Sequence, residues 1–295
     1  MTDTGRVQVV VATSTCLTVE HASALGITLV PLRIGVDGHD YRDMIDIGPA
    51  DLYRLLRQGV MPTTASPSVG DYAAAFAAAP GPVLCLTVGS RISAMDSAAR
   101  LAAEETGARE VEIVETGTAA GGLRLVALAA ARLAGEGLAL GPLGERVRAI
   151  CGRVEMSGML ETVEYLARSG RVPEIARWGT SVLRVRPVVR FEAGRGRLAA
   201  LARTPLRGVD EMRKLVREGA RRQGAGPCGE GVVATVFHGD AAALAEELER
   251  RLREDLPAAE LSISEMTAAM AIHVGPGVVG EAYYVDPSGK WANRV

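Results

Sequence analysis

The sequence predicts an α/β protein of two domains: an N-terminal domain with a mostly parallel α/β/α sheet and a C-terminal α+β domain with a mixed sheet. In the first half, short β-branched runs alternate with longer Ala- and Leu-rich amphipathic runs, the pattern of parallel strands connected by helices. The strand-like runs are almost entirely apolar, as expected for strands that helices cover on both faces. In the second half, two adjacent strand-like runs flank a short glycine-containing turn, which indicates antiparallel pairing.

The first domain is expected at residues 3–155. Its strands are expected at 6–12, 27–36, 82–88 and 110–115. Its helices are expected at 49–58, 69–79, 92–105, 118–135 and 139–153.

The second domain is expected at residues 156–285, where the strand–helix rhythm changes. Two strands, "SVLRVRPVVRF" (181–191) and "GRLAALAR" (196–203), are expected to pair through the turn "EAGRGR". A helix at 206–222, a strand at 231–237, a helix at 240–254 and strands at 260–266 and 280–285 follow. Residues 286–295 are polar and are expected to form a surface or disordered tail.

Composition excludes several classes of protein. A formal net charge of −2 does not indicate a basic surface for nucleic acid, so nucleic-acid binding is not expected. The four cysteines show no C-x-x-C spacing and the four histidines are scattered, so neither a metal site nor a disulfide scaffold is expected. The N-terminus does not resemble a signal peptide, and no apolar run reaches membrane-spanning length. We therefore expect a cytoplasmic protein without an integral membrane segment.

The stretch "VMPTTASPSVGDY" (60–72) gathers four hydroxyl side chains around Pro67: Thr63, Thr64, Ser66 and Ser68. One interpretation is a helix cap, in which Ser68 accepts an N–H from a helix that begins near Val69. The other is a cradle for a carboxylate or phosphate, because hydroxyls beside a helix start form an anion site. Local sequence favours the cap.

Three further loops that follow expected strands also carry hydroxyls: 12–18, 88–93 and 115–118. Ligands of open α/β sheets bind beyond the carboxyl ends of the strands, where such loops lie. Four hydroxyl-bearing loops at one edge strengthen the case for a polar ligand site.

The stretch "GPGVVG" (275–280) matches the dinucleotide fingerprint G-x-G-x-x-G by letter only. Too little chain follows Gly280 for the helix, second strand and ribose-binding acid that the fingerprint requires. Pro276 also removes an N–H that a pyrophosphate would need. The chain also contains neither a P-loop nor a G-x-S-x-G elbow, so no cofactor is expected.

Six segments occur in the order seen in the DegV family, which this chain resembles from about Val7 to Tyr284. They are "PLRIGVDGHDYRD" with "PTTASPSVGDY", then "LTVGSRISA", "VETGTAAGGL", "VEYLARSGRV", "LARTPLRG" and "AIHVGPGVVG". Each motif alone is weakly specific, and the shared order makes the resemblance strong.

The resemblance implies a function. DegV proteins bind fatty acids, and some act in phospholipid metabolism as the carrier subunit of bacterial fatty acid kinase. The resemblance implies that the acid lies at the domain interface with its tail in an apolar tunnel. Its carboxylate is presented to a separate ATP-dependent kinase that makes acyl phosphate. The carrier itself is not catalytic.

The resemblance also implies roles for particular residues. Thr64, Ser93 and His273 match the carboxylate contacts, and Ser66 and Ala94 are their neighbours in the same motifs. Two arginines, Arg171 and Arg203, match positions implicated in engaging the kinase. The chemistry is consistent, because hydroxyls and helix-terminal N–H groups give a carboxylate charge-assisted hydrogen bonds without an ion pair. Each buried methylene of the tail adds about 0.8 kcal/mol.

The chain departs from the family pattern at three places. The loop Thr-Ser-Gln-Pro-Ser is Thr64-Ala65-Ser66-Pro67-Ser68, the first-strand Asp is Thr13, and Gly-Thr-Tyr is Ala94-Met95-Asp96. These changes bear on loop geometry and ligand choice and leave the polar anchors in place.

Two other functions remain open at this point. One is a lipid hydrolase with Ser93 as nucleophile and His273 as base, although a nucleophile elbow and an evident orienting acid are lacking. The other is a sensor of a different small anion.

Overall fold

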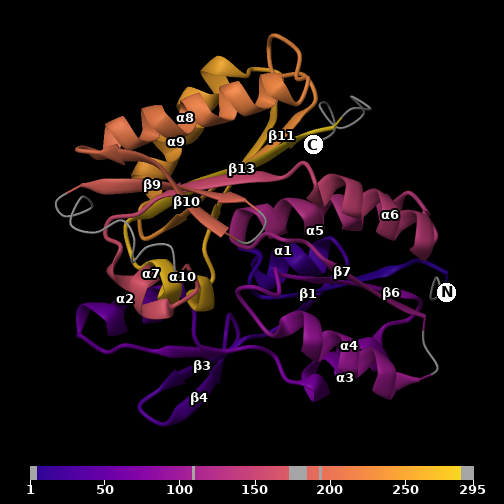
Figure 1. Cartoon of the computed structure of the whole chain (residues 1–295). Coiled ribbons are helices and arrows are strands. Elements are labelled where there is room, and N and C mark those ends of the chain that lie inside the picture. The colour runs from indigo at the N-terminus through magenta and orange to yellow at the C-terminus, as the bar shows by residue number, and fades with distance from the viewer. Residues whose placement is uncertain (1–4, 108–109, 173–184, 193–194, 287–295) are drawn as a thin grey trace. The chain divides into compact units, whose positions relative to one another are not determined.

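The computed structural model describes residues 5–107, 110–172, 185–192 and 195–286, and the chain divides into two compact units (Figure 1). Unit 1 comprises Met1–Gly152 and Thr267–Ile272, and unit 2 comprises Arg153–Met266 and His273–Val295. The α/β class, with a parallel sheet in the first unit and a mixed sheet in the second, is confirmed.

The segment Thr267–Ile272 groups with unit 1, whereas the sequence places it in the second domain. Its physical anchor is Asp43, a fully buried carboxylate whose Oδ1 accepts the N–H of Ala269 at 3.0 Å. Apolar burial adds to this bond, since Ala268, Ala269 and Ala271 are inaccessible to solvent. Because this hydrogen bond joins residues far apart in the chain, no local sequence pattern predicts it.

Unit 1 is built on a four-stranded sheet in which all neighbours are parallel. Its order is β2 (Ile27–Val30), β1 (Gln8–Ala12), β6 (Val83–Thr87) and β7 (Val111–Glu115). Helices α3 (Val69–Ala78) and α4 (Met95–Thr106) lie on one face of the sheet, and α5 (Ala120–Gly135) and α6 (Leu140–Cys151) lie on the other (Figure 1). Two shorter helices, α1 (Val19–Ala24) and α2 (Pro49–Arg57), also belong to unit 1.

The sheet is sandwiched because its strands are apolar on both faces. All five residues of β6 are buried. Tyr72 and Phe76 of α3 pack with Ala99 and Ala102 of α4 against Cys85 on one side. This arrangement points the carboxyl ends of the parallel strands, and the loops that follow them, toward one edge.

The expected strand at 27–36 was wrong as a single element. It breaks after Val30 into β2 and β3 (Arg33–Val36), and Pro31 at the break has no N–H for a sheet ladder. β3 pairs antiparallel with β4 (His39–Arg42) and β5 (Thr63–Ala65) in a separate three-stranded sheet. Part of the hydroxyl-rich stretch is therefore a strand.

Unit 2 contains a six-stranded mixed sheet. Its order is β10 (Arg195–Ala202), β9 (Arg186–Glu192), β8 (Glu155–Met159), β13 (Val278–Val285), β11 (Val232–Gly239) and β12 (Glu260–Glu265). Only the β11–β12 pair is parallel. The expected antiparallel pair is confirmed as β9–β10, although residues 181–184 of its first strand lie outside the described residues.

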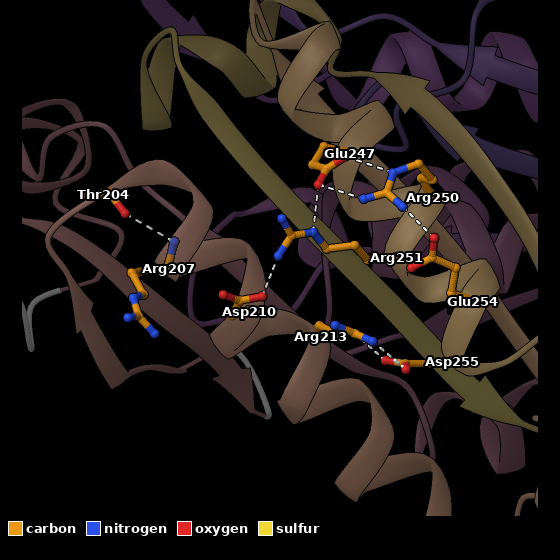
Figure 2. Close-up of polar contacts among 9 residues, drawn as sticks. All are labelled: Thr204, Arg207, Asp210, Arg213, Glu247, Arg250, Arg251, Glu254 and Asp255. Atoms are coloured by element: carbon orange, nitrogen blue, oxygen red, sulfur yellow. Dashed lines mark hydrogen bonds and ion pairs between the residues drawn. The ribbon is translucent and has the colours of Figure 1, made fainter.

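Two helices, α8 (Pro205–Arg222) and α9 (Ala242–Asp255), cover one face of this sheet (Figure 1). Ion pairs join their facing edges (Figure 2). Arg213 on α8 donates to Asp255 at 2.6 Å, and Arg251 on α9 donates to Asp210 at 2.5 Å. Arg213 and Arg251 therefore link the two helices to each other.

Two short helices complete the fold: α7 (Glu164–Ser169) and α10 (Ala268–Val274). The expected polar tail, 286–295, lies outside the described residues except for Asp286. Within the described part of the chain, no helix is long and apolar enough to cross a membrane.

Candidate functional site

Two serines from separate loops meet in unit 1. The Oγ atoms of Ser66 and Ser93 lie 3.0 Å apart, although the residues are 27 positions apart in the chain. Ser66 lies in the loop that leads into α3, and Ser93 lies in the loop that leads into α4. Both side chains are partly buried. Two of the residues expected at the ligand site are therefore in hydrogen-bond contact.

The start of α4 lies beside this serine pair. Ser93 Oγ accepts the N–H of Met95, the first residue of the helix, at 3.3 Å. The N-cap residue is Ala94, which is exposed and has no side-chain acceptor. The first-turn N–H groups of a helix favour an anion. Ser66, Ser93 and the start of α4 therefore place hydrogen-bond donors of the kind that suit an anion close together.

Thr64 occupies the middle of β5, where it pairs across the strand with Ile34 of β3. It is partly buried and stands two residues before Ser66. Its position in a paired strand, rather than in a free loop, gives its backbone a fixed orientation.

Ser68 is the N-cap of α3, as the sequence predicted. Its Oγ accepts the N–H of Asp71 at 3.1 Å, and Asp71 in return accepts the N–H of Ser68 at 2.9 Å. This reciprocal pair is a capping box. Arg33 of β3 donates to the second oxygen of Asp71 at 2.8 Å, which ties the loop to the antiparallel sheet. Sequence reasoning missed Arg33, although the Ser-x-x-Asp spacing signals the box itself.

His273 lies near the end of α10 and is counted with unit 2. Burial and, to a smaller extent, the positive charge of Arg171 lower its pKa to about 4. The imidazole is therefore neutral at pH 7, with one nitrogen that donates and one that accepts. A neutral imidazole offers a carboxylate a hydrogen bond rather than an ion pair.

The glycine-rich turn after His273 has a structural role. Gly275 has a φ of +78°, and a Cβ there would lie 2.2 Å from the ring of Tyr165. Gly277 donates its N–H to the carbonyl of Gly239 at 2.7 Å. Residues 275–280 run into strand β13 and not into a helix, which agrees with the rejection of the dinucleotide fingerprint.

The two arginines expected to contact a partner are exposed on unit 2. Arg171 follows the end of α7 and donates to the carbonyl of Ser169 at 2.6 Å. Arg203 directly precedes Thr204, the N-cap of α8, whose Oγ1 accepts the N–H of Arg207 (Figure 2). No group of His, Cys, Asp and Glu side chains suited to a metal ion occurs among the described residues.

The chain was compared with known families and proteins. The model of the family described as "Uncharacterised protein, DegV family" matches residues 6–286. A DegV domain-containing protein of Mycobacterium tuberculosis is 30% identical over 290 residues, which is 96% of this chain and 98% of the relative.

The chain belongs to the DegV family.

Solved DegV structures share its fold. One from Thermus thermophilus, described by its fatty acid binding, is 28% identical and superposes with a TM-score of 0.87 over 95% of this chain and 100% of that one. A DegV family protein from Corynebacterium glutamicum is 26% identical, with a TM-score of 0.80 over 95% and 97% of the two chains. The similarity therefore extends across both units of this DegV protein.

Proposed function

We propose that this DegV family protein binds a long-chain fatty acid and presents its carboxylate to a separate ATP-dependent fatty acid kinase. The observation that carries the proposal is the Ser66–Ser93 hydroxyl pair beside the start of α4. It occurs in a chain 28% identical to a Thermus thermophilus protein described by its fatty acid binding.

The ligand carboxylate is proposed to accept hydrogen bonds from Thr64 and Ser93, with Ser66 and Ala94 completing that end of the site. Ser66 and Ser93 bond to each other at 3.0 Å. A carboxylate can replace that mutual bond and accept a hydrogen bond from each hydroxyl. Hydrogen bonds to an ionised acceptor are shorter and stronger than those between neutral groups. His273 is proposed as a further contact, and its neutral imidazole adds one hydrogen bond without neutralising the acid.

This choice of donors suits a carrier. A bidentate arginine clamp would engage both carboxylate oxygens, including the one that a kinase must phosphorylate. Hydroxyls and a neutral histidine hold the group while leaving its charge and nucleophilic oxygen available. Affinity then comes mainly from the tail, at about 0.8 kcal/mol for each buried methylene.

The transfer of the phosphoryl group is assigned to a separate kinase, with Arg171 and Arg203 as its contacts. Both side chains are exposed, and a pair of exposed cations suits an acidic surface on a partner. The carrier itself is proposed to be non-catalytic.

The test is mass spectrometry of an organic extract from protein purified without heat or detergent. We expect long-chain acids, and we expect the variant Ser66→Ala/Ser93→Ala to retain much less of them at an unchanged melting temperature. If the protein contains no acid and takes up none on incubation with oleate, the proposal is wrong.

A parallel assay with p-nitrophenyl esters addresses hydrolysis. We expect no turnover above background. Turnover that is abolished by Ser93→Ala would support a hydrolase in place of a carrier.

A further inference from the structure

A carboxylate of the chain itself lies in the first turn of α4. Asp96 is the second residue of the helix, three positions after Ser93, and only 9% of it is exposed. Its Oδ1 accepts the hydroxyl of Thr87, the last residue of β6, at 3.2 Å. An acid placed at the start of α4 competes with a second anion for the same favourable helix end, and like charges repel.

Arg100 holds this carboxylate from one turn further along α4. Its Nε lies 2.7 Å from Asp96 Oδ2, and its Nη2 lies 3.2 Å from Oδ1. The guanidinium therefore forms a two-pronged pair with both oxygens, the strongest arrangement available to these groups. The arginine side chain is about half exposed and reaches Asp96 along the helix surface.

A second carboxylate faces the loop that contains Ser93. Glu115, at the end of β7, accepts the N–H of Ser90 at 2.7 Å. The hydrogen bond to Asp96 raises the pKa of Arg100, and the charges of Asp96 and Glu115 raise it further. Arg100 thus lies in the field of both acids that flank the 88–94 loop.

We propose that Arg100 determines the affinity of this site for anions by neutralising Asp96 and, at longer range, Glu115. It is a positioning residue that acts through Asp96 and does not contact the ligand. The inference rests on the proposed function, since it concerns the carboxylate expected at Ser93. On this inference, the site binds a ligand carboxylate only because Arg100 pairs with Asp96, the carboxylate of the protein at the start of α4.

Binding of two probes tests the proposal: oleate, and oleyl alcohol, which has the same chain without a charge. The variants are Arg100→Gln, Asp96→Asn and the double variant. The control is Arg54→Gln, which breaks an ion pair within another helix of unit 1, Arg54–Asp51 at 2.8 Å on α2. Dissociation constants are measured at low and high salt, with the melting temperature of each variant.

We expect Arg100→Gln to weaken oleate binding by about threefold to tenfold at low salt, because it leaves Asp96 charged near the ligand. High salt should reduce the loss, since ions screen the exposed part of this field. Oleyl alcohol should bind every variant within about twofold of the original protein, because it has no charge to repel. The double variant should recover oleate binding, and Arg54→Gln should not change it.

Three results would overturn the assignment of Arg100 while leaving fatty acid binding intact. The first is unchanged oleate affinity in Arg100→Gln. The second is an equal loss of oleate and oleyl alcohol in that variant, and the third is a double variant that does not recover oleate binding; both would indicate a structural effect. If the unaltered protein binds no oleate, the proposed function and this inference both fail.

Discussion

Ser68 and Ser93 both precede helices, yet their hydroxyls have different partners. Ser68 Oγ is engaged by the first turn of its own helix through the capping box with Asp71. Ser93 Oγ accepts the N–H of Met95 in its own helix and also lies 3.0 Å from Ser66 Oγ of a different loop. We therefore expect substitutions at the two serines to act on different properties.

Removal of the Ser93 hydroxyl should weaken ligand binding. We expect Ser93→Ala to reduce oleate affinity by roughly 1 to 3 kcal/mol, the cost typical of a charged group that lacks one hydrogen bond. Calorimetric titration with oleate measures this change. An unaltered affinity would remove Ser93 from the site.

Removal of the Ser68 hydroxyl should weaken folding instead. We expect Ser68→Ala to lower the free energy of unfolding by about 1 kcal/mol, the usual cost of a lost N-cap. Urea denaturation measures stability, and oleate titration of the same variant should show little change. A variant of normal stability with weak oleate binding would reverse the assigned roles.

His273 should report the ligand through its own titration. Burial and the charge of Arg171 lower the pKa of its imidazole to about 4. A carboxylate nearby favours the charged form, so we expect saturation with oleate to raise this pKa. NMR titration of the His273 ring measures it, and a pKa that stays unchanged or falls contradicts contact with the acid.

At the scale of elements, strand β13 contains a buried carboxyl group. Glu281 is 1% exposed and lies opposite Ser157 of β8, whose hydroxyl donates to its Oε1 at 2.5 Å. Its Oε2 has no hydrogen-bond partner among the described residues. Burial raises the pKa of this carboxyl to about 8.

This raised pKa predicts a pH dependence of stability. Between the usual value of 4.5 and about 8, the folded protein keeps a proton that the unfolded chain has released. The contribution of this group to stability is therefore fully present below this window and is lost as pH rises through it. We expect Glu281→Gln to flatten that slope, as measured by urea denaturation across the window.

The matched control for this substitution is Glu211→Gln, at an exposed glutamate of α8. The control should keep the slope of the unaltered protein. If Glu281→Gln also keeps it, the carboxyl is not the group that titrates.

At the scale of the whole molecule, fatty acid binding and presentation of the acid to the kinase should depend on different residues. Arg171 and Arg203 are exposed and belong to unit 2, whereas Thr64 and Ser93 belong to unit 1. We expect Arg171→Ala and Arg203→Ala to retain their fatty acid and melting temperature while acyl phosphate formation with the kinase falls sharply. The surviving activity should weaken as salt rises.

To check this prediction, the amount of fatty acid bound and the amount converted to acyl phosphate are measured in the same preparation of each variant. Arg146→Ala, at an exposed arginine of α6, is the matched control and should keep both. Loss of lipid together with activity in Arg171→Ala would assign that residue to the ligand site or to the fold.

Local patterns determined much of this protein from sequence alone. The alternation of apolar runs and amphipathic runs indicates the parallel sheet of unit 1, because strand and helix periodicities depend only on neighbouring residues. The same holds for the cap at Ser68, whose partner lies three residues away. The order of the motifs indicated the DegV family, which the match over residues 6–286 confirms.

Tertiary structure decided what depends on distant partners. The pairing of β3 with β5 and the grouping of Thr267–Ile272 with unit 1 both follow from contacts between separate segments. The same is true of the Ser66–Ser93 contact, which joins residues 27 positions apart. A single sequence records which residues can make such contacts, but the choice among them is made by the burial and hydrogen bonding of the folded chain.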